Sequence, residues 1–166
     1  MFKRIGIILC IAVACSPEQE QVEVVDHAEL AAVTAAIQQV FDGMRAQDSA
    51  MVRARLADGA VLSRAGERDG VPTLSSSSTD GWLNAIGQPR EEMLDEQIWD
   101  LEIQIDGRLA TAWMKYAFFR GGEFSHCGVN AMMLFKDADG WKIFSLADTS
   151  RRDRDQCWMP PGYEEA

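Results

Sequence analysis

The stretch "FFRGGEFSHCGVNAMML" (Phe118–Leu134) decides the fold, because it places two apolar strands around a Gly121-Gly122 turn. Two-residue turns that contain glycine are typical of β-hairpins. Asp106-Gly107 and Asp139-Gly140 mark similar turns on either side, and from Asp95 onward apolar and polar residues alternate as in half-buried strands. These patterns predict four antiparallel strands joined as a meander.

Helices are predicted ahead of the meander. The first begins at a capping-box pattern, Asp26 followed three residues later by Glu29, and continues with apolar residues at helical spacing. A polar loop rich in Gly and Ser starts at Gly66, and a loop of this length either lines a site or is a surface insertion. The remaining patterns predict, in chain order, helices over 26–45 and 48–59, a short strand over 60–65 and a helix over 79–86.

The front of the chain is typical of an export signal. Lys3 and Arg4 precede an apolar run that ends at Ala14, and this run is shorter than the ~20 residues of a membrane span. Cys15 follows at once, so "AVAC" (12–15) resembles a lipobox. We expect a signal peptide over 1–14, a lipidated Cys15 with a polar tether to residue 25, and a periplasmic or outer-membrane-anchored bacterial protein. A free secreted form is the alternative.

Composition limits the domain count and the partners. The chain has 166 residues, with 16 basic and 26 acidic side chains, for a formal charge of −10. About 150 residues remain after signal cleavage, which predicts one domain over 26–152 followed by a tail over 153–166. An acidic surface repels nucleic acid and anionic lipid headgroups, so membrane contact is expected only through the lipid anchor.

The cysteines predict one disulfide bond. Cys10 leaves with the signal and Cys15 is the expected anchor, so Cys127 and Cys157 are the pair that remains. An exported protein meets an oxidising compartment, where such a pair forms a disulfide that would hold the tail against the sheet. Two free thiols are the alternative.

Strand register predicts a polar cluster on one sheet face. Counting back from the Gly-Gly turn pairs Ala117 with His126 and Trp113 with Asn130, and a three-residue loop at 138–140 pairs Asn130 with Asp148. This count puts Tyr116 on the opposite face. The cluster of Trp113, His126, Asn130 and Asp148 then adjoins an apolar floor formed by Thr111, Met132, Leu134, Phe144 and Leu146. Polar groups beside apolar surface are typical of small-molecule pockets, and the alternative is an ordinary cross-strand hydrogen bond beside a solvated histidine.

The order of elements resembles a known superfamily. Two amphipathic helices, a short strand, a third helix and a meander closing on "ADGWKIFSLADTS" (138–150) resemble the NTF2-like proteins, and "FSHCGVNAM" (124–132) resembles their exported SnoaL-like or lumazine-binding-like bacterial branch. The resemblance implies an α+β cone in which three N-terminal helices pack on a curved antiparallel meander sheet. It also implies a cone pocket for a small hydrophobic or aromatic molecule and a homodimer through the sheet. A monomer whose C-terminal tail covers that sheet face is the alternative.

Three functions follow as hypotheses. The first is non-catalytic ligand binding, with Trp82, Trp99 and Trp113 as pocket walls and His126, Asn130 and Asp148 as orienting groups. The second is a lyase or isomerase in which Asp148 and His126 move a proton, although the expected position of Tyr116 departs from the ketosteroid isomerase pattern. The third is a module that recruits a protein through the apolar sheet face. No cofactor and no metal site are expected.

Overall fold

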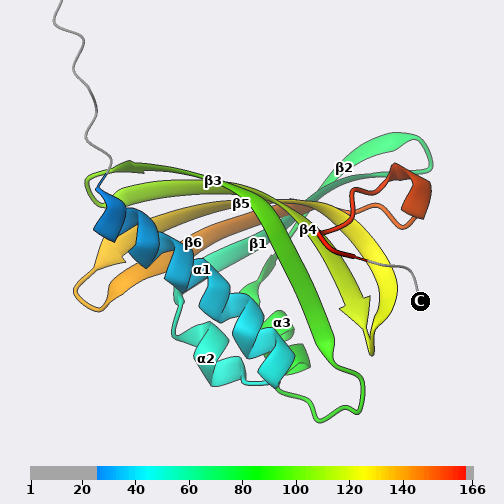
Figure 1. The fold of residues 1–166 in the computed structure, drawn as a ribbon, viewed down its shortest axis with the longest axis horizontal. Coiled ribbons are helices and arrows are strands. Elements are labelled where there is room, and N and C mark those ends of the chain that lie inside the picture. The colour runs from blue at the N-terminus through cyan, green and yellow to red at the C-terminus, as the bar shows by residue number, and fades with distance from the viewer. Residues whose placement is uncertain (1–25, 164–166) are drawn as a thin grey trace, which may run out of the picture.

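The computed structural model describes residues 26–163, which form one curved sheet with helices packed against its inner face (Figure 1). The predicted signal peptide, Cys15 and the tether lie outside these residues. Within the described range, no helix is both long and apolar enough to cross a membrane.

Helix α1 (His27–Ala46) begins where the sequence predicts, at the cap residue Asp26. The Asp26 carboxylate accepts hydrogen bonds from the backbone N–H groups of Ala28 (2.9 Å) and Glu29 (3.3 Å). The Glu29 side chain does not complete the predicted capping box. It accepts a 3.0 Å hydrogen bond from the Trp141 indole and pairs with Lys136 instead. These two contacts therefore fix the start of α1 to the end of the sheet that contains Lys136 and Trp141.

Two shorter helices follow, α2 (Ser49–Arg53) with Asp48 as its cap and α3 (Thr79–Ile86). Helix α2 ends earlier than predicted, because the chain enters a strand at Leu56. Within residues 26–163, only α1 and α2 precede the sheet in the sequence, and α3 follows the second strand, which corrects the prediction of three N-terminal helices.

The sheet has six strands in the order β2-β1-β6-β5-β4-β3. Strands β3 to β6 form the predicted antiparallel meander, but β1 runs parallel to β6, so the sheet is mixed. The strands are β1 (Leu56–Arg68), β2 (Val71–Ser78), β3 (Leu94–Asp106), β4 (Leu109–Arg120), β5 (Glu123–Asp137) and β6 (Gly140–Thr149).

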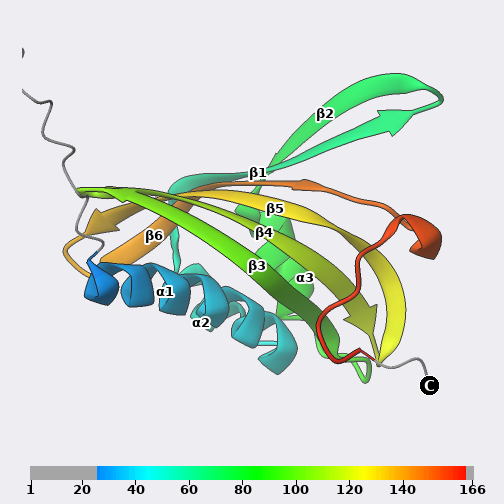
Figure 2. The same ribbon diagram turned by 45° about the horizontal axis from the view of Figure 1, so that its top comes forward.

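The prediction of a polar loop after Gly66 is wrong. This segment contains the end of β1, a turn and the whole of β2, and these form a hairpin that projects from the body of the protein (Figure 2). Asp69 and Gly70 form its turn with φ values of 54° and 78°, as the Asp-Gly hairpin turn requires. All eight residues of β2 are exposed, so burial imposes no apolar alternation on the sequence.

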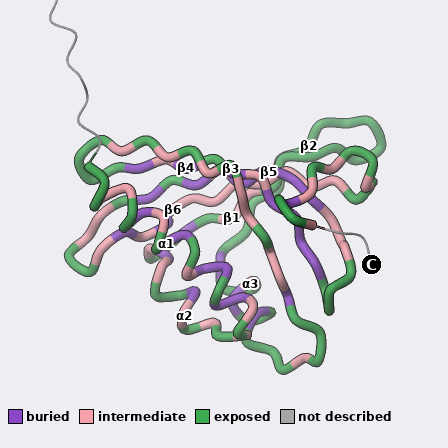
Figure 3. The backbone as a smooth tube through the Cα atoms, viewed as in Figure 1, coloured by how far each residue is buried: buried purple, intermediate pink, exposed green. Residues whose placement is uncertain are grey.

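The core lies between the inner face of the sheet and the helices, as the buried segments in Figure 3 show. From α1, the fully buried residues include Val33, Ile37 and Val40. The facing sheet residues are apolar and buried: Ala112, Met114, Tyr116, Leu134, Trp141 and Ile143.

The C-terminal tail covers one end of the outer sheet face. The predicted disulfide between Cys127 and Cys157 is present. Beyond it, Tyr163 stacks on Phe119 with ring centroids 5.6 Å apart. The other end of this face leaves large apolar side chains 38–54% exposed, and a homodimer through them stays a prediction. These side chains are Leu109, Trp113, Met133 and Phe135.

We predict that the disulfide contributes substantially to stability. It joins residues 30 positions apart, and closing a loop of that length stabilises a fold by about 3 to 4 kcal/mol through the reduced entropy of the unfolded chain. Replacing Cys127 and Cys157 by Ser together should lower the urea midpoint accordingly. An unchanged midpoint would show that the bond does not constrain the unfolded chain.

Candidate functional site

One β-bulge in the central hairpin decides which side chains share the inner face. Arg120 pairs with Glu123 as predicted, but Ser125 is an extra residue, so His126 pairs with Phe118 and Asn130 with Met114. The predicted pairs of His126 with Ala117 and Asn130 with Trp113 are therefore wrong by one position, which exchanges the two faces of a strand.

Two predicted positions are corrected as a result. Trp113 lies on the outer face and is 54% exposed, whereas Tyr116 lies on the inner face and is 1% exposed. Trp99 also faces outward, since it pairs with the outward-facing Lys115. The cause is a second bulge, at Asp100, whose left-handed φ of 51° resets the alternation along β3.

The last hairpin keeps the predicted pairing of Asn130 with Asp148 by a different route. Its turn has two residues rather than three, because Asp137 pairs with Gly140. A bulge at Phe144 then restores the register. The structure therefore places His126, Asn130 and Asp148 on the inner face together.

A cavity of about 310 Å³ opens on this face, between the sheet, α1 and α3. We call it the inner cavity. Of the predicted site residues, Trp82, Asn130 and Asp148 line it. Trp99, Trp113 and His126 are not among its lining residues. The lining is apolar at Phe41, Met44, Leu62, Trp82 and Leu146, and polar at Ser63, Arg64, Ser75, Ser77, Glu96, Asn130 and Asp148.

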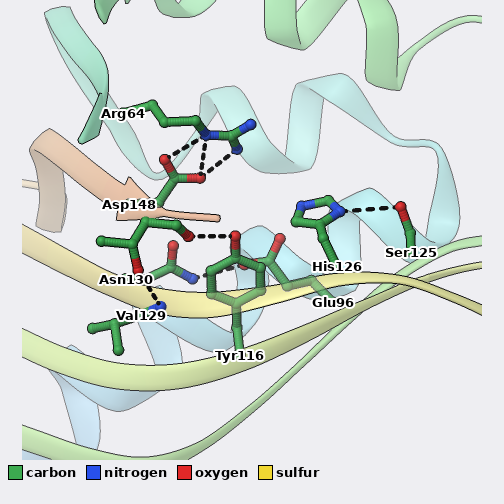
Figure 4. A network of polar contacts seen from close by, with 9 residues as sticks. Arg64, Glu96, Tyr116, Ser125, His126, Val129, Asn130 and Asp148 are labelled. Carbon is green, nitrogen blue, oxygen red and sulfur yellow. Dashed lines mark hydrogen bonds and ion pairs between the residues drawn. The ribbon is translucent and has the colours of Figure 1, made fainter. Parts of the chain in front are cut away.

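An ion pair between neighbouring strands forms one side of the inner cavity. The parallel register of β1 and β6 sets Arg64 opposite Asp148. The Arg64 Nε donates to Asp148 Oδ1 at 2.8 Å, and Nη2 donates to Oδ2 (Figure 4). The Asp148 side chain is 13% exposed, and this paired arrangement raises the pKa of Arg64. Both carboxylate oxygens of Asp148 are thus occupied by one guanidinium.

Glu96, which the sequence analysis missed, is the second carboxyl of the inner cavity. The buried Asn130 amide donates to Glu96 Oε1 at 2.7 Å. Burial raises the pKa of Glu96 to about 7, and the nearby negative charge of Asp148 acts in the same direction. Across residues 26–163, no cationic side chain forms an ion pair with Glu96. Its carboxyl therefore changes charge close to neutral pH.

Tyr116 and His126 lie beside this pair of carboxyls (Figure 4), although neither is among the residues that line the inner cavity. The Tyr116 hydroxyl donates to the Thr149 carbonyl at 2.8 Å, and burial raises the pKa of the phenol. The glycine of "SHCGVN" permits this contact, because a Cβ on Gly128 would lie 1.9 Å from the Thr149 carbonyl oxygen and 2.8 Å from the Tyr116 ring.

The half-buried His126 imidazole packs against two aromatic rings. Its centroid lies 5.0 Å from that of Phe118 and 5.7 Å, edge-on, from that of Tyr116. Burial lowers the pKa of His126 to about 4, and the positive charge of Arg64 contributes. The ring is therefore neutral at pH 7 and a weak base.

Comparisons with known proteins identify the fold. No family model and no curated protein matches the chain. Among solved structures, an NTF2-like protein of unknown function from Shewanella baltica is 16% identical, with a TM-score of 0.56 over 75% of this chain and 94% of that one. An NTF2-like protein with a cystatin-like fold from Novosphingobium aromaticivorans is 11% identical, with a TM-score of 0.60 over 74% and 81%. The chain has the NTF2-like fold.

A third similar structure has a name that bears on chemistry. It is a candidate dehydratase of the NTF2-like family from Streptomyces avermitilis, 16% identical, with a TM-score of 0.58 over 75% of this chain and 96% of that one. Identities this low establish the NTF2-like fold alone, since one fold hosts unrelated activities.

The first prediction for this site concerns pH. The pKa of Glu96 in the folded protein is about 7, whereas an unfolded chain holds Glu near ~4.3. The unfolded state therefore loses its proton first, and the free energy of unfolding falls as pH rises between these two values. Glu96→Gln removes this cost, so the variant should be more stable than the natural protein above pH 7 by roughly 3 to 4 kcal/mol, with the difference shrinking toward pH 4.

Thermal unfolding at several pH values measures this effect. Glu102→Gln is the matched control, because Glu102 is an exposed residue of the same strand. A stability gain that is the same at every pH, or that also appears in the control, would contradict the assignment.

Proposed function

We propose that the inner cavity binds a small organic molecule with an apolar or aromatic body and at least one polar group. The observation that supports this proposal is the mixed lining of the cavity, in which apolar and aromatic side chains adjoin carboxyl, guanidinium, amide and hydroxyl groups. Its volume of about 310 Å³ is at the lower end of ligand-binding pockets, which run from roughly 300 to 1,000 Å³. A ligand of one ring with a short substituent suits this space.

The apolar and the polar lining residues have different roles in this proposal. Trp82 from α3 and Phe41 and Met44 from α1 supply the surface against which the ligand body packs. Glu96 and the Arg64–Asp148 pair supply the polar groups that orient it. Asn130, which donates to Glu96, is 3% exposed and lies on β5, an inner strand of the sheet.

Export and a lipid anchor at Cys15 are part of the same proposal. The bond between Cys127 and Cys157 supports it, since disulfides persist in oxidising compartments and are rare in the cytosol. A domain held at a membrane surface would present its cavity to small molecules of the periplasm.

Acid–base catalysis is a second candidate, and one observation favours it: a carboxyl with a pKa of about 7 lines the inner cavity. Glu96 would then take the role first assigned to Asp148 and His126. Both oxygens of Asp148 are held by Arg64, and His126 is a weak base. The name of the Streptomyces avermitilis protein is consistent with a lyase. An activity that Glu96→Gln abolishes while ligand binding persists would establish this reading.

Fluorescence provides the test of binding. Trp82 is the one tryptophan among the residues that line the inner cavity, so a bound ligand should change its emission. We expect a saturable change with small aromatic compounds that is lost in Trp82→Phe and retained in Trp113→Phe, the control on the outer face.

A blank screen of such compounds by fluorescence and thermal shift would contradict the proposal. A ligand at about a hundred times its Kd stabilises the folded state by about 2.7 kcal/mol, so binding of useful strength would not escape the thermal measurement. A response that disappears in Trp113→Phe instead would move the site to the outer face.

A further inference from the structure

The charges that line the inner cavity do not cancel. Two carboxyls, Glu96 and Asp148, face one guanidinium, Arg64. Arg64 donates hydrogen bonds from Nε and Nη2 to the carboxylate of Asp148, and the two side chains form a bidentate ion pair. The carboxyl in excess is Glu96.

Glu96 also retains unused hydrogen-bonding capacity. Oε1 accepts from Asn130 at 2.7 Å, but Oε2 accepts no hydrogen bond from any group within residues 26–163. Glu96 lines the inner cavity, so this oxygen is available to a ligand. An ionised carboxylate in a partly buried site is costly without a cation, and a ligand that brings one removes that cost.

The other groups around Glu96 do not supply the missing cation. The charged and titratable side chains near it are Arg64 on β1, Asp95 on β3, Tyr116 on β4, His126 on β5 and Asp148 on β6. Asp95 and Asp148 are acidic, Tyr116 and His126 are neutral at pH 7, and Arg64 is held by Asp148. Arg45 is bound to Asp95 at 2.9 Å.

Aromatic surface and overall charge favour the same class of ligand. Trp82 and Phe41 line the inner cavity, and aromatic faces attract organic cations. The chain carries a formal charge of −10, so its field attracts cations and repels anions.

We propose that the inner cavity selects a small protonated amine, with its ammonium group on Glu96 Oε2 and its apolar body against Trp82. This inference rests on the proposed function, since it names the ligand class of the same site. It excludes a carboxylate or phosphate as the preferred ligand, because those groups would meet Glu96 and find Arg64 already paired.

Benzylamine, benzyl alcohol and benzoate test the inference, because they share one aromatic body and differ in charge. Isothermal titration calorimetry near pH 7 should show benzylamine binding about tenfold tighter than benzyl alcohol, with benzoate weakest. Titrations in two buffers of different ionisation enthalpy count released protons. Glu96 is about half protonated at this pH, so amine binding should release roughly half a proton and the alcohol none.

Glu96→Gln separates the inference from the proposed function. The variant should lose both the preference for the amine and the proton release, so that it binds amine and alcohol about equally, while Glu102→Gln behaves as the natural protein. Three results would overturn the inference but leave the proposal of a ligand-binding cavity intact. They are equal affinities for amine and alcohol, tightest binding of benzoate, and a preference for the amine that is retained in Glu96→Gln.

If no amine binds at millimolar concentration, the inference fails. The proposed function fails only if neutral compounds also leave Trp82 unchanged.

Discussion

The parallel pairing of β1 with β6 is the constraint on which the candidate site depends. It sets Arg64 directly opposite Asp148, and the resulting two-pronged ion pair occupies both oxygens of one cavity carboxylate. Glu96 is left as the carboxyl without a cationic partner. Burial of Glu96 raises its pKa, and the division of roles between the two acids leaves it without an ion-pair partner, on which the proposed ligand depends.

The fold tolerates this costly group because the surroundings are fixed from several sides. Helix α1 is held at its start by the contacts of Glu29 with Lys136 and Trp141. The opposite end of the sheet is held by the disulfide bond between Cys127 and Cys157. A scaffold fastened at both ends can keep an unpaired carboxyl in place, and such groups are common where proteins bind or react.

Much of the meander could be predicted from the sequence, because its turns carry strong local signals and its strands alternate. The disulfide followed from the cysteine count.

The bulges at Ser125 and Asp100 could not be predicted, since nothing in the local sequence distinguishes them from regular strand residues. Each bulge exchanges the two faces of a strand, which is why Trp113 and Trp99 were expected in the site and Tyr116 outside it. Glu96 was missed for a related reason: it lies on the inward side of β3 just before a bulge. The Asp69-Gly70 pair is typical of a hairpin turn, but β2 is exposed throughout and lacks apolar alternation, so the pattern did not predict a strand there.

The titration of the Glu96 carboxyl tests the central claim most directly. Carbon-13 NMR of the side-chain carboxyl groups, followed from about pH 4 to pH 9, should show one glutamate with a midpoint of about 7, and that resonance should be absent from Glu96→Gln. A midpoint for Glu96 near the ordinary ~4.3 would contradict the account, because it would mean that the carboxyl is solvated or already paired.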